Sequence, residues 1–166
     1  MSRPTLALAA TLALTVALTP VAPAGVADTP LPVLVPGQTT QLLYTVPGVI
    51  MGGESLGSFF FCTSTDTAAI QVGVELFSSV GGAPANDAVA SSLSVFPGGT
   101  VRFGTISPAG FTVGSVLGGF GYGSARILAT SKKLLCTAFV ADLFGNPPQT
   151  SWQLTVIAKT KQKAAN

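Results

Sequence analysis

Apolar and polar residues alternate in short runs along most of the chain, and residues that favour turns separate these runs. The clearest run is Ile70–Phe77. Successive side chains of a β-strand point to opposite faces, so this run predicts one buried face and one face toward water. The buried face would carry Ile70, Val72, Val74 and Leu76, and the other face Gln71, Gly73 and Glu75.

Eight further runs predict strands by alternation or by a short, dense apolar composition. They are Thr39–Val46, Ser58–Thr63, Leu93–Phe96, Val101–Phe103, Phe111–Leu117, Ser124–Thr130, Leu134–Ala141 and Trp152–Ala158. Turns and loops are predicted at Pro47–Gly53, Val80–Ala90, Pro97–Gly99, Gly118–Gly123 and Lys132–Lys133, the last as the solvated tip of a hairpin. Ala83–Leu93 also fits a short helix. About seven to nine short strands predict a single all-β domain over residues 39–158, either a sandwich of antiparallel strands or a closed barrel.

The N-terminal segment has the pattern of a secretory signal peptide. Arg3 precedes an apolar run, Leu6–Leu18, and proline and small residues follow. Cleavage is predicted after Ala24 or Ala27, which both fit the small-x-small pattern. The apolar run is shorter than the roughly 20 residues that cross a bilayer as a helix. We therefore expect residues 1–24 to be removed and the protein to be secreted, either extracellular or periplasmic.

Two segments flank the predicted domain. Residues 28–38 form an arm with three prolines, and proline removes a hydrogen-bond donor, so the arm predicts at most an edge strand. Residues 159–166 form a short basic tail, which we expect to be flexible.

The overall charge is small. Charged residues make up only 8% of the chain, and removal of Arg3 lowers the formal net charge from +2 to +1. This balance excludes the strong electrostatic footprint of nucleic-acid-binding proteins. After the leader, no apolar run approaches the length of a transmembrane helix. We expect neither a nucleic-acid partner nor an integral membrane segment in the mature protein.

The chain has two cysteines, Cys62 in an early predicted strand and Cys136 in a late one. In an exported chain the two most simply form one disulfide, which would bridge the two sheets of a sandwich. The alternatives are two free thiols or a metal-binding pair. A metal pair would need further ligands, and the chain has no histidine and no third cysteine.

The chain resembles immunoglobulin-like domains in general outline. Cys62 and Cys136 have a separation like that of the bridging cysteines of this superfamily, and Pro97–Phe103 (PGGTVRF) is similar to a turn-and-strand unit of its bacterial members. The resemblance implies an immunoglobulin-like β-sandwich. The chain departs from the pattern because no tryptophan lies on the strand after Cys62, and because Leu134, not a tyrosine, stands two residues before Cys136. The resemblance implies no function and no site residues.

No catalytic or metal site is predicted. Gly53–Gly57 (GESLG) matches the G-x-S-x-G nucleophile elbow, but that elbow needs a helix after the serine and a histidine to take its proton. The missing histidine also excludes zinc hydrolase and blue-copper sites. The few carboxylates form no metal-binding motif, although loop carboxylates could hold calcium. Asp66 is expected to cap its own turn. We expect no enzyme activity, no cofactor and no metal.

Aromatic residues beside the cysteines give the main candidate interaction site. If both cysteines point inward, alternation directs a set of apolar neighbours outward. These are Phe59, Phe61, Leu135 and Phe139. Exposed apolar patches are typical of protein contacts; the alternative is that a loop or the arm covers them, or that a bulge changes the register. Phe120 and Tyr122, in the glycine-rich loop, would either bind a glycan or peptide or fold back on the core.

These features predict a non-catalytic structural or interaction module with a protein partner or self-association. The alternative is a subunit of a surface fibre or assembly, in which residues 28–38 add as a strand to a neighbouring subunit. Neither hypothesis identifies a specific ligand.

Overall fold

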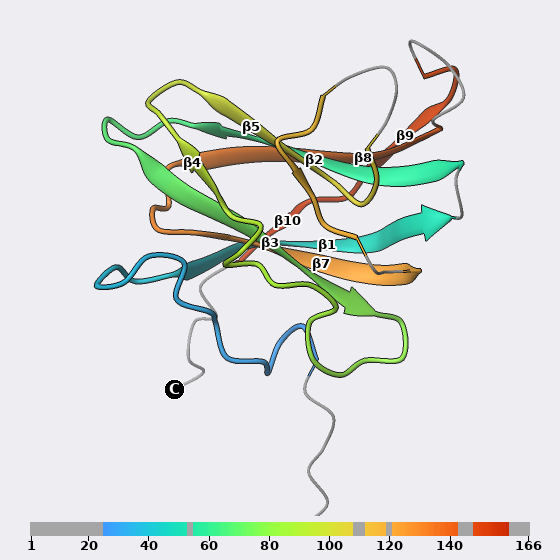
Figure 1. Ribbon diagram of the computed structural model, residues 1–166, viewed down its shortest axis with the longest axis horizontal. Helices are drawn as coiled ribbons and strands as arrows, with labels where there is room; N and C mark the ends of the chain where they lie inside the picture. The colour runs from blue at the N-terminus through green and yellow to red at the C-terminus, as the bar shows by residue number, and fades with distance from the viewer. Residues whose placement is uncertain (1–24, 53–54, 108–111, 119–120, 143–147, 160–166) are drawn as a thin grey trace, which may run out of the picture.

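Ten β-strands make up the regular structure of the described residues, which are 25–52, 55–107, 112–118, 121–142 and 148–159 of a computed structural model (Figure 1). The strands are β1 (Gln41–Gly52), β2 (Leu56–Ser64), β3 (Ile70–Ser78), β4 (Leu93–Val95), β5 (Thr100–Gly104), β6 (Ser115–Val116), β7 (Tyr122–Ala129), β8 (Leu134–Asp142), β9 (Ser151–Leu154) and β10 (Ile157–Ala158). None of the described residues lies in a helix, and the all-β class is confirmed. The predicted signal peptide, residues 1–24, and residues 160–166 of the predicted tail lie outside the described residues.

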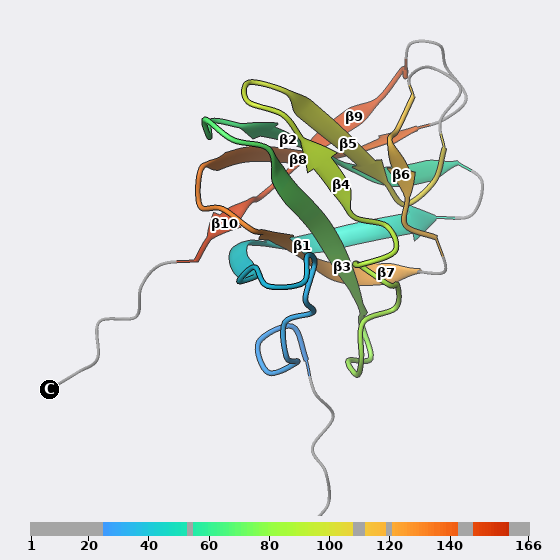
Figure 2. The same ribbon diagram turned by 60° about the vertical axis from the view of Figure 1, so that its left-hand side comes forward.

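The strands form one sheet that is nearly closed into a barrel (Figures 1 and 2). Its main order is β4-β3-β7-β1-β2-β5-β6, with β10 on β1 and with β8 and β9 beyond β2. All of these pairs are antiparallel except β5–β6, which is parallel. We call β4, β3, β7, β1 and β10 the A half, and β6, β5, β2, β8 and β9 the B half. The end of β1 joins the two halves, because Met51 and Gly52 pair with Gly57 and Leu56 of β2.

The observed strands follow the predicted ones with four differences. The predicted strand Phe111–Leu117 is observed only as β6, Ser115–Val116, and Phe111 lies outside the described residues. β1 continues to Gly52, into the predicted Pro47–Gly53 turn, because a bulge between Pro47 and Val49, with Gly48 at φ 76°, absorbs the turn residues without ending the strand; Gly53 lies outside the described residues. The predicted strand Trp152–Ala158 is divided into β9 and β10, since the chain passes there from the B half to the A half. The alternative helix over Ala83–Leu93 does not form.

Two connections that look local in the sequence cross between the halves. β4 pairs with β3 whereas β5 pairs with β2, so the Pro97–Gly99 turn carries the chain from the A half to the B half. The Lys132–Lys133 tip is exposed as expected, but β7 and β8 lie in different halves, so the predicted hairpin there is wrong. A turn signal indicates that the chain reverses, and burial then decides which strands pair.

The core lies between the inner faces of the two halves. Ile70, Val72, Val74 and Leu76 of β3 are at most 5% exposed, which confirms the predicted buried face. They pack in one cluster with inward residues of the B half, among them Phe60, Cys62, Phe103 and Ala138.

Cys62 and Cys136 form the predicted disulfide, but it does not bridge two sheets. The two residues pair directly across β2 and β8, which are neighbouring strands of the B half, and their Cα atoms are 4.2 Å apart. A distance this short is typical of directly opposite residues in an antiparallel pair. The expectation of a bridge between sheets, on which the resemblance to immunoglobulin-like domains depended, is therefore wrong. Separation along the chain does not reveal which strands become neighbours.

Candidate functional site

A buried ion pair lies on the outer face of the A half. Glu75 of β3 and Arg126 of β7 pair directly in the sheet register and are only 4% and 1% exposed. Their inward neighbours Val74 and Ile127 belong to the core, so alternation places both charged side chains on the opposite face. The prediction that Gly73 and Glu75 face water is therefore wrong, because another segment covers them.

The covering segment is the N-terminal arm, which in the structure comprises residues 25–38. It contains no strand and lies beneath β3 and β7 (Figures 1 and 2). Leu34 of the arm is 5% exposed. A Cβ added at Gly73 would lie 2.9 Å from Leu34 Cδ2 and 3.1 Å from the carbonyl oxygen of Ala88, so glycine lets the covering segments approach the sheet closely.

Arg126 connects the arm to the sheet. Its Nε donates to the Glu75 carboxylate, and its Nη1 donates to the carbonyl oxygens of Thr29, at 2.8 Å, and Val26, at 3.3 Å. Nη2 donates to the carbonyl of Pro30 at 3.0 Å. The guanidinium also lies 5.0 Å from the centroid of the Phe77 ring, within the range of a cation–π contact. The planar guanidinium can satisfy several acceptors at once, and a lysine could not reproduce this geometry.

The predicted aromatic site lies on the outer face of the B half, and the structure brings most of its members together. The Phe59 and Phe139 ring centroids are 5.5 Å apart, and those of Phe61 and Phe139 are 5.2 Å apart in an edge-to-face arrangement. Phe59 is completely buried, so its expected exposure is wrong. Its ring lies close to Gly57 and Gly104, and Ile106, beyond the end of β5, also packs against Gly57. A loop therefore covers this part of the face.

The other predicted interaction residues differ in exposure. Leu135 is 63% exposed, and Phe61 and Phe139 are half-buried. Tyr122 is 67% exposed at the start of β7. Phe120 lies outside the described residues. The structure thus leaves Leu135, with the accessible parts of Phe61 and Phe139, as the candidate contact surface of β2 and β8.

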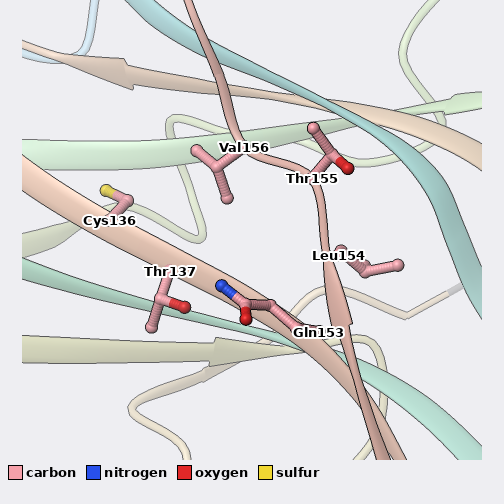
Figure 3. Close-up of a pocket in the computed structure, with 6 residues that line it drawn as sticks. All are labelled: Cys136, Thr137, Gln153, Leu154, Thr155 and Val156. Carbon is pink, nitrogen blue, oxygen red and sulfur yellow. The ribbon is translucent and has the colours of Figure 1, made fainter.

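A hollow of about 540 Å³ adjoins the disulfide (Figure 3). Cys136 and Thr137 of β8 lie on one side, and Gln153–Val156 lie on the other, where the chain leaves β9 and crosses to the A half. Its lining contains polar amide and hydroxyl groups but no carboxylate or cation. The hollow can offer neutral hydrogen bonds, but it lacks a group for general acid–base or nucleophilic chemistry.

The carboxylate of Asp66 is engaged in local structure. Asp66 accepts from the backbone N–H of Thr67 at 2.7 Å, as expected, and also from the hydroxyl of Ser131. With the Lys133 ammonium nearby, these donors lower the pKa of Asp66 from 3.8 to about 2, and the Ser131 hydrogen bond is the largest cause.

Neither a metal cluster nor a nucleophile elbow forms in the described parts of the chain. They contain no group of three or more His, Cys, Asp or Glu residues that could hold a metal ion. Ser55 of the GESLG motif lies in the turn before β2, so a strand follows it where the elbow needs a helix.

Sequence reasoning missed the Glu75–Arg126 pair, although a signal for it was present. Arg126 interrupts an otherwise apolar strand, as Glu75 does in the cleanest alternating run. Charged residues are rarely buried unless they are paired. Two opposite charges in two apolar strands could therefore have suggested a buried pair, but the arm that covers it has no such signature.

No protein-family model, curated protein or solved structure matches the chain. Among the described residues, no helix is long and apolar enough to cross a membrane.

Proposed function

We propose that the protein is a non-catalytic interaction module that works outside the cytoplasm and binds a protein partner through the outer surface of β2 and β8. The observation that supports this most directly is Leu135, which is 63% exposed on the same outer face as the half-buried Phe61 and Phe139. Aromatic and large aliphatic side chains at a partly exposed sheet face are typical of protein contacts.

The extracytoplasmic location is supported by two features. The disulfide is of the kind that persists in oxidising compartments, and the leader pattern directs export. A secreted or periplasmic protein is therefore the location that we propose.

We also propose that the fold is an immunoglobulin-like β-sandwich. Inward side chains from both halves of the sheet meet in one core, which is the packing that a sandwich requires. The disulfide within one half weighs against the immunoglobulin pattern and leaves a general sandwich as the better form of this proposal.

Site-specific photo-crosslinking in the producing cells tests the proposed contact. A photo-reactive amino acid at Leu135 should give a discrete adduct with a protein partner, whereas the same amino acid at Phe96 should not. Phe96 is the matched control because it is also apolar and is 73% exposed, but lies at the β4–β5 turn. Equal labelling at both positions, or none at Leu135, would reject the β2–β8 surface as the contact.

A further inference from the structure

The arm covers only part of the outer face of the A half. It lies on Glu75 and Arg126 of β3 and β7, whereas the same face of β1 and β10 borders a groove of about 870 Å³. Thr45 pairs with Arg126 on one side and with Ile157 on the other, so these three residues share the outer face. We call this hollow the β1–β10 groove; its lining includes Leu31, Leu42, Thr45, Lys132, Ile157 and Lys159.

Apolar side chains remain accessible in the β1–β10 groove. Leu31 of the arm is 37% exposed and Ile157 of β10 is 51% exposed. Leu42 pairs with Leu128, which alternation places on the outer face, so Leu42 adds to the same apolar strip. The exposure of both walls shows that the groove is open to solvent. Small apolar ligands favour cavities that enclose most of their surface, so an open strip is better suited to a chain segment.

Cations lie near the beginning of β1. Lys132 follows β7, whose Ala129 pairs with Gln41, and the backbone N–H of Lys159 donates to the carbonyl of Leu43 at 2.9 Å. Both lysines are exposed, and neither forms an ion pair with a described residue. Asp66 is held to the Lys132 turn by hydrogen bonds from Ser131 and Lys133, which already engage its carboxylate.

The groove lining contains neither aspartate nor glutamate. Among the described lining residues the charge is therefore positive, at the lysine end. This favours an anionic occupant, because complementary charge steers and orients a partner.

We propose that the β1–β10 groove binds an extended acidic segment of a partner protein, with apolar side chains against Leu31 and Ile157 and carboxylates beside Lys132 and Lys159. Thr40–Thr45 line the groove, and a strand rises about 3.3 Å per residue, so about five residues of an extended peptide match its length. The site is separate from the β2–β8 surface, and either one can fail without the other.

A fluorescent peptide with two leucines followed by four glutamates tests the site in a direct titration of the mature protein. We expect saturable binding that weakens with added salt, as exposed charge pairs require. The double variant Lys132→Gln with Lys159→Gln should weaken the binding about tenfold, in line with two partly exposed ion pairs. Lys133→Gln is the matched control, because it removes the neighbouring lysine of the same turn, which the groove lining does not include.

The apolar contacts are tested by a second pair of variants. Ile157→Ser should weaken binding of the peptide, and Phe96→Ser, at another exposed apolar position, should not. Amide signals of Leu31, Leu42 and Ile157 should shift in NMR spectra on addition of the peptide. Equal losses in Lys133→Gln and the double variant, unchanged binding in Ile157→Ser, or shifts confined to β8 would overturn the proposal. Concentration-dependent shifts of the groove without peptide would assign it to a second copy of the chain instead.

Discussion

Arg126 is the residue through which the arm and the sheet are joined. Its guanidinium has a carboxylate on one side and three arm carbonyls on the other, and the whole group is 1% exposed. Burying an ion pair carries a large desolvation penalty, so such a pair contributes little when intact, but removal of one partner leaves an uncompensated charge. Replacing Arg126 alone should therefore lower the free energy of unfolding more than replacing both Arg126 and Glu75.

We expect Arg126→Met to lower the free energy of unfolding by about 3–5 kcal/mol, since Glu75 would remain buried without its partner. The double variant Glu75→Leu with Arg126→Met should be clearly more stable than Arg126→Met alone. Urea unfolding followed by circular dichroism measures both. Arg102→Met is the control, because Arg102 is exposed on β5 and should change stability by less than about 0.5 kcal/mol. A double variant no more stable than Arg126→Met would contradict the assignment of the loss to an unpaired charge.

Asp66 links the turn after β2 to the turn after β7 and should make stability depend on pH. Its pKa in the folded state, about 2, lies below its usual value of 3.8. The carboxylate therefore stabilises the fold at pH values above about 4, and this contribution is lost as the pH falls toward 2. Ser131→Ala removes the largest cause of the shift and should raise the pKa of Asp66 in an NMR titration. An unchanged Asp66 titration in this variant would show that Ser131 does not hold the pKa down.

At the scale of single elements, the disulfide joins two strands that already pair. β2 and β8 are in register from Leu56–Asp142 to Ser64–Leu134, with the bridge between Cys62 and Cys136 near one end. Because the hydrogen-bonded ladder does not depend on the sulfur atoms, the bridge acts mainly on the unfolded chain. Its stabilising effect follows from the 74 residues that separate the cysteines.

Replacing both cysteines by alanine should lower the free energy of unfolding by about 4.5 kcal/mol according to the chain-entropy estimate. The far-ultraviolet circular dichroism of the folded variant should remain that of a β protein. Denaturant unfolding of the oxidised protein and the variant measures the difference. A loss below about 1 kcal/mol would indicate that residual structure already keeps the unfolded chain compact without the disulfide.

At the scale of the whole molecule, the sequence was sufficient for local structure but not for pairing. Alternation in β3 located its core face correctly, because side-chain direction in a strand is a local property. Alternation also predicted that Glu75 and Phe59 are exposed, and this is wrong. Both lie on outer faces, where the arm covers Glu75 and packing near the end of β5 covers Phe59. Leu135 remained exposed because it lies beyond this cover. Which loop covers which face depends on contacts between distant segments, and no local pattern encodes them.

The position of the arm leads to a prediction about assembly. Donor-strand fibres need a free segment, whereas this arm is bound to its own chain through Arg126 and Leu34. We therefore expect size-exclusion chromatography with light scattering to give a monomer of the mature protein at micromolar concentration. Arg126→Met loses the hydrogen bonds to the arm but keeps the Leu34 contact, so this variant should also elute as a monomer. Polymers in the wild-type protein that disappear on deletion of residues 28–36 would instead support the fibre alternative, because strand exchange would then be the source of assembly.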